Sequence, residues 1–203
     1  KTAYDISLGL VGSEMCIRDR DLSAAMVEYA RAKFERLGLW RAEAVVGDMA
    51  MLPLARRYDA ALCALNTFSH ILTLELARVH LSRVAEVLRE GGVYCIDLAP
   101  AGARESVWVN EVLGVVARCK WKRGEGSGVV EESYEFVFVW PDGSKRVLKG
   151  SMPMRAWTVR EFLELVEGVD GLELEACYDK FDPSEPVEPD ESMRRMVAVL
   201  KRV

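Results

Sequence analysis

The feature that most constrains the fold is the stretch at residues 58–70, which reads Tyr-Asp-Ala-Ala-Leu-Cys-Ala-Leu-Asn-Thr-Phe-Ser-His. Within it, Ala60–Leu65 is an unbroken apolar run, which is typical of a strand covered on both faces in a parallel α/β sheet. The run stops abruptly at Asn66 and Thr67, and His70 follows closely. Because ligands of open α/β sheets bind beyond the carboxyl ends of the strands, this polar cluster indicates a binding site. Capping of the next helix by Asn66 or Thr67 explains these two residues equally well.

The length of the chain, 203 residues, fits one domain with room for an inserted subdomain. Hydrophobic residues make up 50% of it, which is enough for a sizeable core. The 27 basic and 32 acidic residues give a net charge of −5 without a basic stripe, so nucleic acid is not an expected partner. No apolar run approaches the roughly 20 residues of a membrane helix, and we expect no membrane partner.

The five cysteines are odd in number and widely spaced, which fits neither a disulfide framework nor paired zinc ligands. We therefore expect reduced thiols, a cytoplasmic location and no metal site. Glutamine is absent, and asparagine occurs only at Asn66 and Asn110. This depletion of thermolabile amides favours a thermophilic source.

Residues 1–20 lack an initiator Met and closely resemble a translated sequencing adapter that recurs at the ends of unrelated assembled sequences. We expect this segment to be non-native, with the domain spanning residues 21–203. The alternative is a native strand at Ile6–Val11 followed by a glycine turn. Gly9 and Gly12 do not form a G-x-G-x-x-G fingerprint, and no helix pattern follows them directly.

From Asp21 to Pro100 the hydrophobic pattern alternates between helix and strand, which predicts parallel βαβ units. Gly38 follows the first helix as a C′ glycine would, and Glu90-Gly91-Gly92 is expected to break the second helix from the strand after it. The expected helices are Ala24–Leu37 and Thr73–Leu88, and the expected strands are Ala42–Val46, Asp59–Leu65 and Val93–Leu98.

The second half of the chain predicts an inserted antiparallel β-meander at residues 117–156, with hairpin chemistry at Pro141-Asp142-Gly143. One face of its middle strand is aromatic, because every second residue from Tyr134 to Trp140 is Tyr, Phe or Trp. Val107–Val116 fits either a helix or a strand. The chain then closes with the helix Val159–Val166, capped by Thr158, and the strands Leu172–Phe181 and Met196–Leu200. No helix joins these two strands, so they should pair antiparallel at the sheet edge.

In the order and spacing of its motifs, the chain resembles the class I methyltransferases that use S-adenosylmethionine. The resemblance covers roughly Asp21 to the C-terminus. The pieces that carry it are Asp21-Leu22-Ser23 with Met26, Gly47-Asp48-Met49, Tyr58-Asp59 with the strand to Asn66, Leu88-Arg89-Glu90-Gly91-Gly92 before a strand ending in Asp97, and the closing helix and hairpin. The aromatic meander resembles that of a small-molecule subgroup, in which such strands cover the active site.

The resemblance implies an α/β fold, a Rossmann-like methyltransferase sheet with an antiparallel terminal hairpin and the inserted β-meander. It also implies that the family's first strand and glycine-rich cofactor turn belong upstream of Asp21, where the suspected adapter lies. That turn lets the backbone approach the cofactor closely, where any side chain would clash. We therefore expect the first strand or strands of the sheet to be missing and the activity of this chain to be impaired.

The resemblance also assigns cofactor-binding roles residue by residue. Asp21 accepts hydrogen bonds from both ribose hydroxyls, as an acceptor-only carboxylate can. Leu22 and Met26 pack near the adenine, Asp48 accepts from the adenine amino group, and the Met49 backbone donates to the ring. The competing interpretations are an N-cap role for Asp21, a turn role for Asp48 and a core position for Met26.

Further roles are implied for the reaction itself. Asn66 faces the methionine end of the cofactor or the substrate. A base is needed only if the acceptor must lose a proton, and His70 is the candidate, although it also fits a residue packed beneath the meander. Trp121 and Tyr134 are candidates for a substrate pocket, with core packing as the alternative, and His80 is expected to be structural.

Two other functions remain open on the sequence alone. An acidic residue after the second strand also suits the ribose of NAD, so an NAD-dependent oxidoreductase is the second candidate. The terminal hairpin and the Gly47-Asp48-Met49 turn argue against it. The third candidate is a degenerate Rossmann-like domain without catalysis. For the methyltransferase, the expected partner is a small-molecule substrate, whose identity the fold does not fix.

Overall fold

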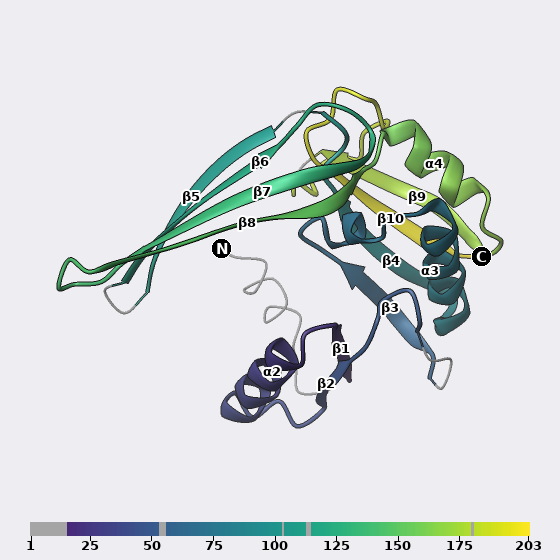
Figure 1. Cartoon of the computed structure of the whole chain (residues 1–203). Helices are drawn as coiled ribbons and strands as arrows, with labels where there is room; N and C mark the ends of the chain where they lie inside the picture. The colour runs from purple at the N-terminus through teal and green to yellow at the C-terminus, as the bar shows by residue number, and fades with distance from the viewer. Residues whose placement is uncertain (1–15, 53–55, 103, 113–114, 180) are drawn as a thin grey trace.

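The computed structural model describes residues 16–52, 56–102, 104–112, 115–179 and 181–203. Three parts are visible in Figure 1: an N-terminal unit, a main sheet with two helices, and a long projecting sheet that we call the arm. The described strands form a two-stranded sheet β1-β2, a four-stranded sheet β3-β4-β10-β9, and the four-stranded arm β5-β6-β7-β8. None of the described helices is long and apolar enough to cross a membrane.

The N-terminal unit is one parallel β-α-β crossover. Strand β1 (Ile17–Asp21) pairs in parallel with β2 (Ala42–Val46), and helix α2 (Ala24–Arg36) connects them. Ser23 is the N-cap of α2, since its hydroxyl accepts from the Met26 N–H, so the N-cap interpretation of Asp21 is wrong. Strand β1 includes residues 17–20, which belong to the segment expected to be non-native. That this segment is non-native stays a prediction. The alternative strand at Ile6–Val11 lies outside the described residues.

The main sheet is mixed. Strand β3 (Tyr58–Cys63) runs parallel to β4 (Leu88–Leu98), which pairs antiparallel with β10 (Met196–Arg202), which in turn pairs antiparallel with β9 (Leu172–Asp179). The predicted antiparallel terminal hairpin is therefore confirmed. Helices α3 (Leu74–Val87) and α4 (Val159–Glu167) lie side by side against this sheet (Figure 1). They bury the main core, whose fully enclosed members include Leu81, Ile96, Phe162 and Leu200.

Two expectations about this sheet are corrected. Strand β3 is not covered on both faces, since Leu62 is 51% exposed. Among the described strands β3 pairs with β4 alone, so it also forms an edge. The segment Glu90-Gly91-Gly92 does not separate helix from strand, since β4 follows α3 directly at Leu88. It forms a bulge, across which the register with β3 jumps from Leu88 to Val93.

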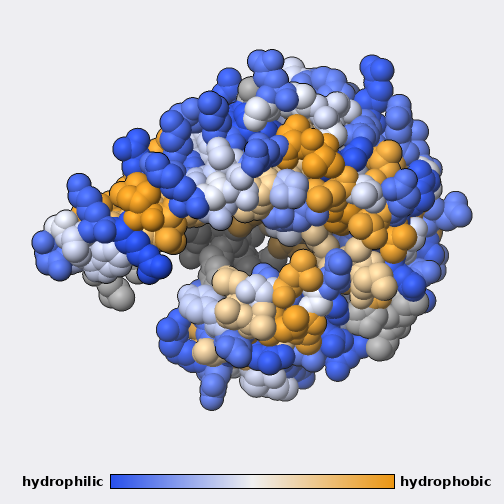
Figure 2. Space-filling view, viewed as in Figure 1, coloured by the Kyte–Doolittle hydropathy of each residue, from blue (hydrophilic) through white to orange (hydrophobic). Residues whose placement is uncertain are grey.

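The arm is a four-stranded antiparallel meander of β5 (Arg104–Val112), β6 (Val115–Arg123), β7 (Gly128–Val139) and β8 (Lys145–Ala156). Strand β5 resolves the ambiguity at Val107–Val116, and it extends the meander beyond the predicted start at residue 117. A short 3₁₀ helix, η1 (Thr67–His70), completes the described elements. The arm projects away from the main sheet, and the space-filling view shows a hydrophobic patch on the arm beside hydrophilic side chains (Figure 2).

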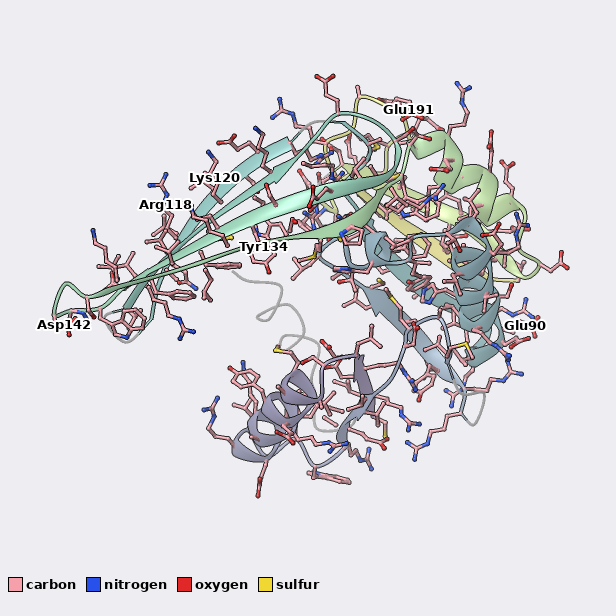
Figure 3. All side chains as sticks on the ribbon, in the orientation of Figure 1. Glu90, Arg118, Lys120, Tyr134, Asp142 and Glu191 are labelled. Carbon is pink, nitrogen blue, oxygen red and sulfur yellow. The ribbon has the colours of Figure 1, made fainter. Side chains whose placement is uncertain are left out.

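The two faces of the arm differ in chemistry. Rings from β6 and β7 form a continuous ladder on one face: the centroids of Trp121 and Tyr134 are 5.4 Å apart, and those of Phe136 and Phe138 are stacked at 6.2 Å. The predicted aromatic face is thus confirmed. Lys120 lies on the other face and pairs with Glu105 at 2.8 Å. Figure 3 shows Arg118 and Lys120 on one side of the arm and Tyr134 on the other.

Candidate functional site

The loop after β3 has an unusual backbone. Leu65 and Asn66 are consecutive non-glycine residues with positive φ, +59° and +61°. Such left-handed conformations cost free energy and persist only where the surroundings hold them, and they gather at functional sites. The Leu65 N–H donates to Asp97 Oδ2 at 2.7 Å, and Asp97 is 2% exposed. Arg195 pairs with both oxygens of that carboxylate, so a partly buried ion pair holds the strained loop.

The side chain of Asn66 is buried and held by two further contacts. Its Oδ1 accepts from the Ala99 N–H at 2.8 Å and from the Ser69 hydroxyl at 2.9 Å. A backbone N–H needs an acceptor, which fixes the orientation of the carboxamide. The two donors on Nδ2 have no protein partner among the described residues. Asn66 occupies the N-cap position of η1 but makes no side-chain cap bond, so the capping interpretation is wrong for it.

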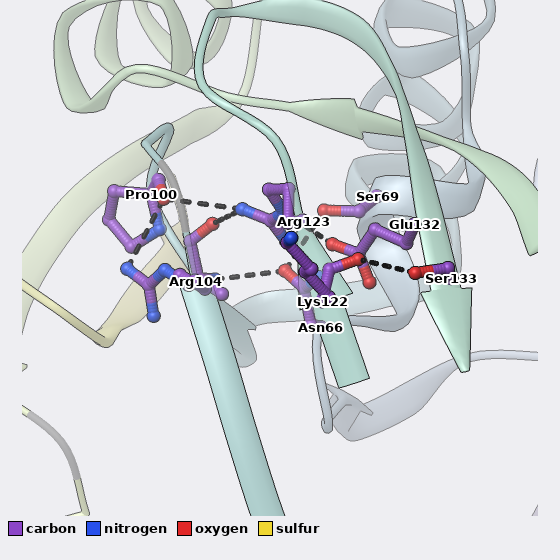
Figure 4. A network of polar contacts seen from close by, with 9 residues as sticks. Asn66, Ser69, Pro100, Arg104, Lys122, Arg123, Glu132 and Ser133 are labelled. Atoms are coloured by element: carbon purple, nitrogen blue, oxygen red, sulfur yellow. Dashed lines mark hydrogen bonds and ion pairs between the residues drawn. The ribbon is translucent and has the colours of Figure 1, made fainter. Parts of the chain in front are cut away.

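A second buried network joins the arm to the end of β4 (Figure 4). Arg123 donates through Nη1 to the carbonyls of Ala99, at 2.9 Å, and Pro100, at 3.3 Å, and through Nε to Glu132. Arg104 donates to the same Pro100 carbonyl at 3.2 Å. Arg123 and Glu132 face one another across β6 and β7, and both are buried. Their pairing was missed at the sequence level, where only two opposite charges flanking the glycine-rich turn at 124–128 hinted at it.

The end of β1 carries the first predicted cofactor residues. Asp21 is exposed, with Oδ1 accepting from the Ser23 N–H at 2.7 Å, and its carbonyl accepts from the Gly47 N–H at 3.0 Å. The second bond brings the end of β1 against the turn that follows β2. Leu22 is 69% exposed and Met26 is 49% exposed, so the core interpretation of Met26 is wrong. Both side chains offer apolar surface to a ligand beside Asp21.

The turn after β2 carries Asp48 and Met49. Asp48 Oδ1 accepts from the Ala50 N–H at 2.8 Å, and its carbonyl accepts from the Met51 N–H at 3.1 Å, so the turn role of Asp48 is confirmed. The carboxylate retains acceptor capacity on its other oxygen. The Met49 carbonyl accepts from His80 Nδ1 at 2.8 Å, whereas the Met49 N–H has no protein partner among the described residues. That free donor fits the backbone role predicted for Met49.

The remaining candidates lie apart from these contacts. His70 ends η1 on the surface and is exposed, so packing beneath the meander is wrong for it. Trp121 and Tyr134 are partly exposed on the aromatic face of the arm. No group of three or more potential metal ligands occurs among the described residues. The cysteines within them are all free thiols.

Comparisons with known proteins bear on the fold. Residues 14–92 match a family model described as a methyltransferase domain. A solved S-adenosylmethionine-dependent methyltransferase from Clostridium acetobutylicum is 18% identical, with 91% of this chain and 74% of that chain covered and a TM-score of 0.73. The amino pentose methyltransferase CalS10 from Micromonospora echinaspora, solved with S-adenosylmethionine bound, is 16% identical, with 92% and 73% covered and a TM-score of 0.69.

The sugar N-methyltransferase KedS8 from Streptoalloteichus is 19% identical, with 90% of this chain and 70% of that chain covered and a TM-score of 0.67. At these identities the structural likeness shows the fold. No curated protein sequence matches the chain.

Proposed function

Because the chain carries a class I S-adenosylmethionine-dependent methyltransferase domain, we propose that it serves methyl transfer to a small-molecule acceptor bound between the arm and the cofactor. The observation that carries this proposal is that the predicted cofactor positions hold hydrogen-bonding groups without a protein partner among the described residues. They are an Asp21 oxygen, an Asp48 oxygen, the Met49 N–H and the Asn66 Nδ2 donors.

The adenosine part of the cofactor fits the residues at the ends of β1 and β2. The second carboxylate oxygen of Asp21 accepts from the ribose hydroxyls, while its first oxygen holds the start of α2. Leu22 and Met26 supply exposed apolar surface for the adenine. Asp48 accepts from the amino group and the Met49 N–H donates to the ring. These roles are the ones that the family resemblance implies, and the donor and acceptor chemistry of each group supports them.

S-adenosylmethionine supplies an electrophilic methyl group on a sulfonium, which a nucleophile displaces in line. The protein contributes alignment and exclusion of water, since the leaving thioether needs no proton. Asn66 is the proposed aligning residue, because its backbone and carboxamide oxygen are fixed while its Nδ2 donors are free for a ligand. His70 is the proposed base for acceptors that must lose a proton, and its exposure lets it exchange that proton with water.

The acceptor is proposed to pack against Trp121 and Tyr134. Both rings lie on the aromatic face of the arm, and their centroids are 5.4 Å apart. CalS10 is described as an amino pentose methyltransferase and KedS8 as a sugar N-methyltransferase. Their likeness to this chain supports a small polar acceptor, with a sugar amine as the first class to assay. A nicotinamide-dependent reaction is not favoured by the family match.

Calorimetric titration of S-adenosylhomocysteine tests the proposal. Two proteins are compared: the chain as printed, and a version in which residues 1–20 are replaced by the sequence encoded upstream of Asp21 in the source DNA. We expect binding by the second protein, and a Kd at least about tenfold weaker for its Asp21→Ala variant, equivalent to about 1.4 kcal/mol. Glu28→Ala is the matched control, because Glu28 is an exposed carboxylate on α2 outside the proposed cofactor positions. Binding of NAD by both proteins without binding of the homocysteine product would overturn the proposal.

A further inference from the structure

A buried chain of hydrogen bonds joins the main sheet to the turn after β2. His80, in the middle of α3, donates from Nδ1 to the Met49 carbonyl at 2.8 Å. Its Nε2 lies 2.8 Å from the Tyr94 hydroxyl on β4. The thiol of Cys63 on β3 lies near Tyr94, and each group acts on the pKa of the other. The chain therefore connects β4 and α3 to the segment that carries Asp48 and Met49.

The direction of each bond is fixed by chemistry. A carbonyl oxygen only accepts, so His80 carries its proton on Nδ1 and its Nε2 is the acceptor. The Tyr94 hydroxyl must then donate to Nε2. A charged imidazolium has no lone pair for Tyr94. The arrangement thus requires a neutral His80.

The surroundings keep all three side chains uncharged. Burial lowers the pKa of His80 below its ordinary value of 6.5, although the bond to Met49 and the charge of Asp48 oppose the shift. Burial raises the pKa of Cys63 to about 11 and that of Tyr94 well above its usual range. Among the described residues, Asp48 on the turn is the one charged group found to act on His80, and Tyr94 on β4 is its titratable partner.

This chain bears directly on how the two α/β parts are aligned. Strands β1 and β2 pair only with one another among the described strands, so no shared ladder sets their position against the main sheet. The side chains of Met49 and Leu52 pack against the main core. The hydrogen bond from His80 to the Met49 carbonyl holds the backbone of this turn against the main sheet. A movement of Met49 carries with it the Asp48 carboxylate and the Met49 N–H.

We propose that His80 and Tyr94 are positioning residues for cofactor binding, which hold the Asp48–Met49 turn in the conformation that receives the adenine. The inference rests on the proposed function for its ligand, but the positioning of the turn is measurable without one. Hydrogen exchange at the Ala50 and Met51 amides reports it, because both amides donate within the turn.

The test compares Tyr94→Phe with Tyr178→Phe, a control on β9, in the protein with the natural upstream sequence. In Tyr94→Phe we expect the Ala50 and Met51 amides to exchange at least about tenfold faster, with the Ala77 amide of α3 unchanged as a report on global opening. The Kd values of S-adenosylhomocysteine and of adenosine should rise together by about tenfold, because the turn contacts only the adenine part. Lowering the pH through and below 6.5 should reproduce both effects in the unaltered protein and not in Tyr94→Phe.

The outcomes separate the two proposals. Unchanged exchange at Ala50 and Met51 overturns the positioning role, as does unchanged adenosine affinity in a Tyr94→Phe protein that still binds it. A third outcome is that exchange responds as expected while neither protein binds S-adenosylhomocysteine or adenosine. The positioning of the turn by His80 and Tyr94 would then stand, and the cofactor role of the turn would be overturned.

Discussion

Asp97 accepts a hydrogen bond of 2.7 Å from the Leu65 backbone N–H, which sets a buried carboxylate of β4 against the strained loop after β3. The bond joins two strands at their carboxyl ends, and Arg195, just before β10, neutralises the carboxylate. Residues that are 98 positions apart in the chain therefore fix the backbone next to Asn66.

Replacing Asp97 with Asn tests this clamp. Asparagine keeps an acceptor for the Leu65 N–H but loses the paired bonds to Arg195, so we expect unfolding free energy to fall by about 1–3 kcal/mol. Urea unfolding followed by tryptophan fluorescence measures the change. Glu175→Gln is the control, since its ion pair with Lys201 is solvent-exposed and should contribute less than about 0.5 kcal/mol. Equal losses of unfolding free energy for the two substitutions would show that the Asp97 contacts do not stabilise the loop after β3.

The left-handed backbone at Asn66 predicts an order among substitutions. Asn66→Ala loses the acceptor for Ala99 and Ser69 and keeps a Cβ at φ +61°, whereas Asn66→Gly loses only the acceptor. We expect Asn66→Gly to be more stable than Asn66→Ala by about 1 kcal/mol, because glycine adopts positive φ without steric cost. Thermal unfolding of the two variants measures the difference. The reverse order would mean that the strain is absent in solution.

The buried Arg123–Glu132 pair predicts strong non-additivity. Arg123→Met leaves the Glu132 carboxylate buried without its partner, and we expect a loss of about 3–5 kcal/mol. The double variant Arg123→Met with Glu132→Leu removes both charges and should recover most of that loss. A double-mutant cycle in urea gives the coupling free energy. Additive single effects would contradict a directly coupled pair.

Protonation of His80 predicts a pH dependence of stability. The folded-state pKa lies below 6.5, so the unfolded chain binds the proton more readily than the folded chain. The stabilisation is fully present above pH 6.5 and is lost as the pH falls toward the folded-state value. We expect the urea midpoint to decrease over that window, and His80→Asn to remove this part of the decrease. A curve for His80→Asn parallel to that of the unaltered protein would exclude the imidazole as its source.

Gly150 predicts a selective effect on the aromatic face. A Cβ at this position would collide with the phenol ring of Tyr134, which covers the glycine from the neighbouring strand. We expect Gly150→Ala to displace that ring and to raise the KM for the acceptor at least about tenfold, with the Kd of S-adenosylhomocysteine unchanged. Steady-state kinetics measures the KM for the acceptor, and calorimetry measures the Kd of S-adenosylhomocysteine. Gly124→Ala, directly after β6, controls for glycine replacement in the arm, because a Cβ there meets open space; an equal effect there would contradict a role for Tyr134.

Three features were predictable from the sequence: the alternation of Tyr134 to Trp140, the capping of α4 by Thr158, and the terminal hairpin. The first two depend on neighbours close in sequence, and the hairpin on a connection without a helix. The prediction that β3 is buried on both faces was wrong, because an apolar run reports what a strand prefers. Its exposure in the fold depends on what packs against the strand. The pairs Asp97–Arg195 and Arg123–Glu132, and the bond from His80 to Met49, depend on contacts that no local pattern encodes.

The far end of the arm closes on a turn of its own, with the Gly143 N–H donating to the Trp140 carbonyl at 2.9 Å and the Ser144 N–H to Asp142 Oδ1 at 2.9 Å. Its geometry therefore owes nothing to Asp21, Met49 or Asn66. Mutations can accumulate at this tip, near Asp142 in Figure 3, while the cofactor chemistry stays constant. A lineage with this architecture is free to vary the end of the arm without rebuilding the part of the molecule on which every turnover depends.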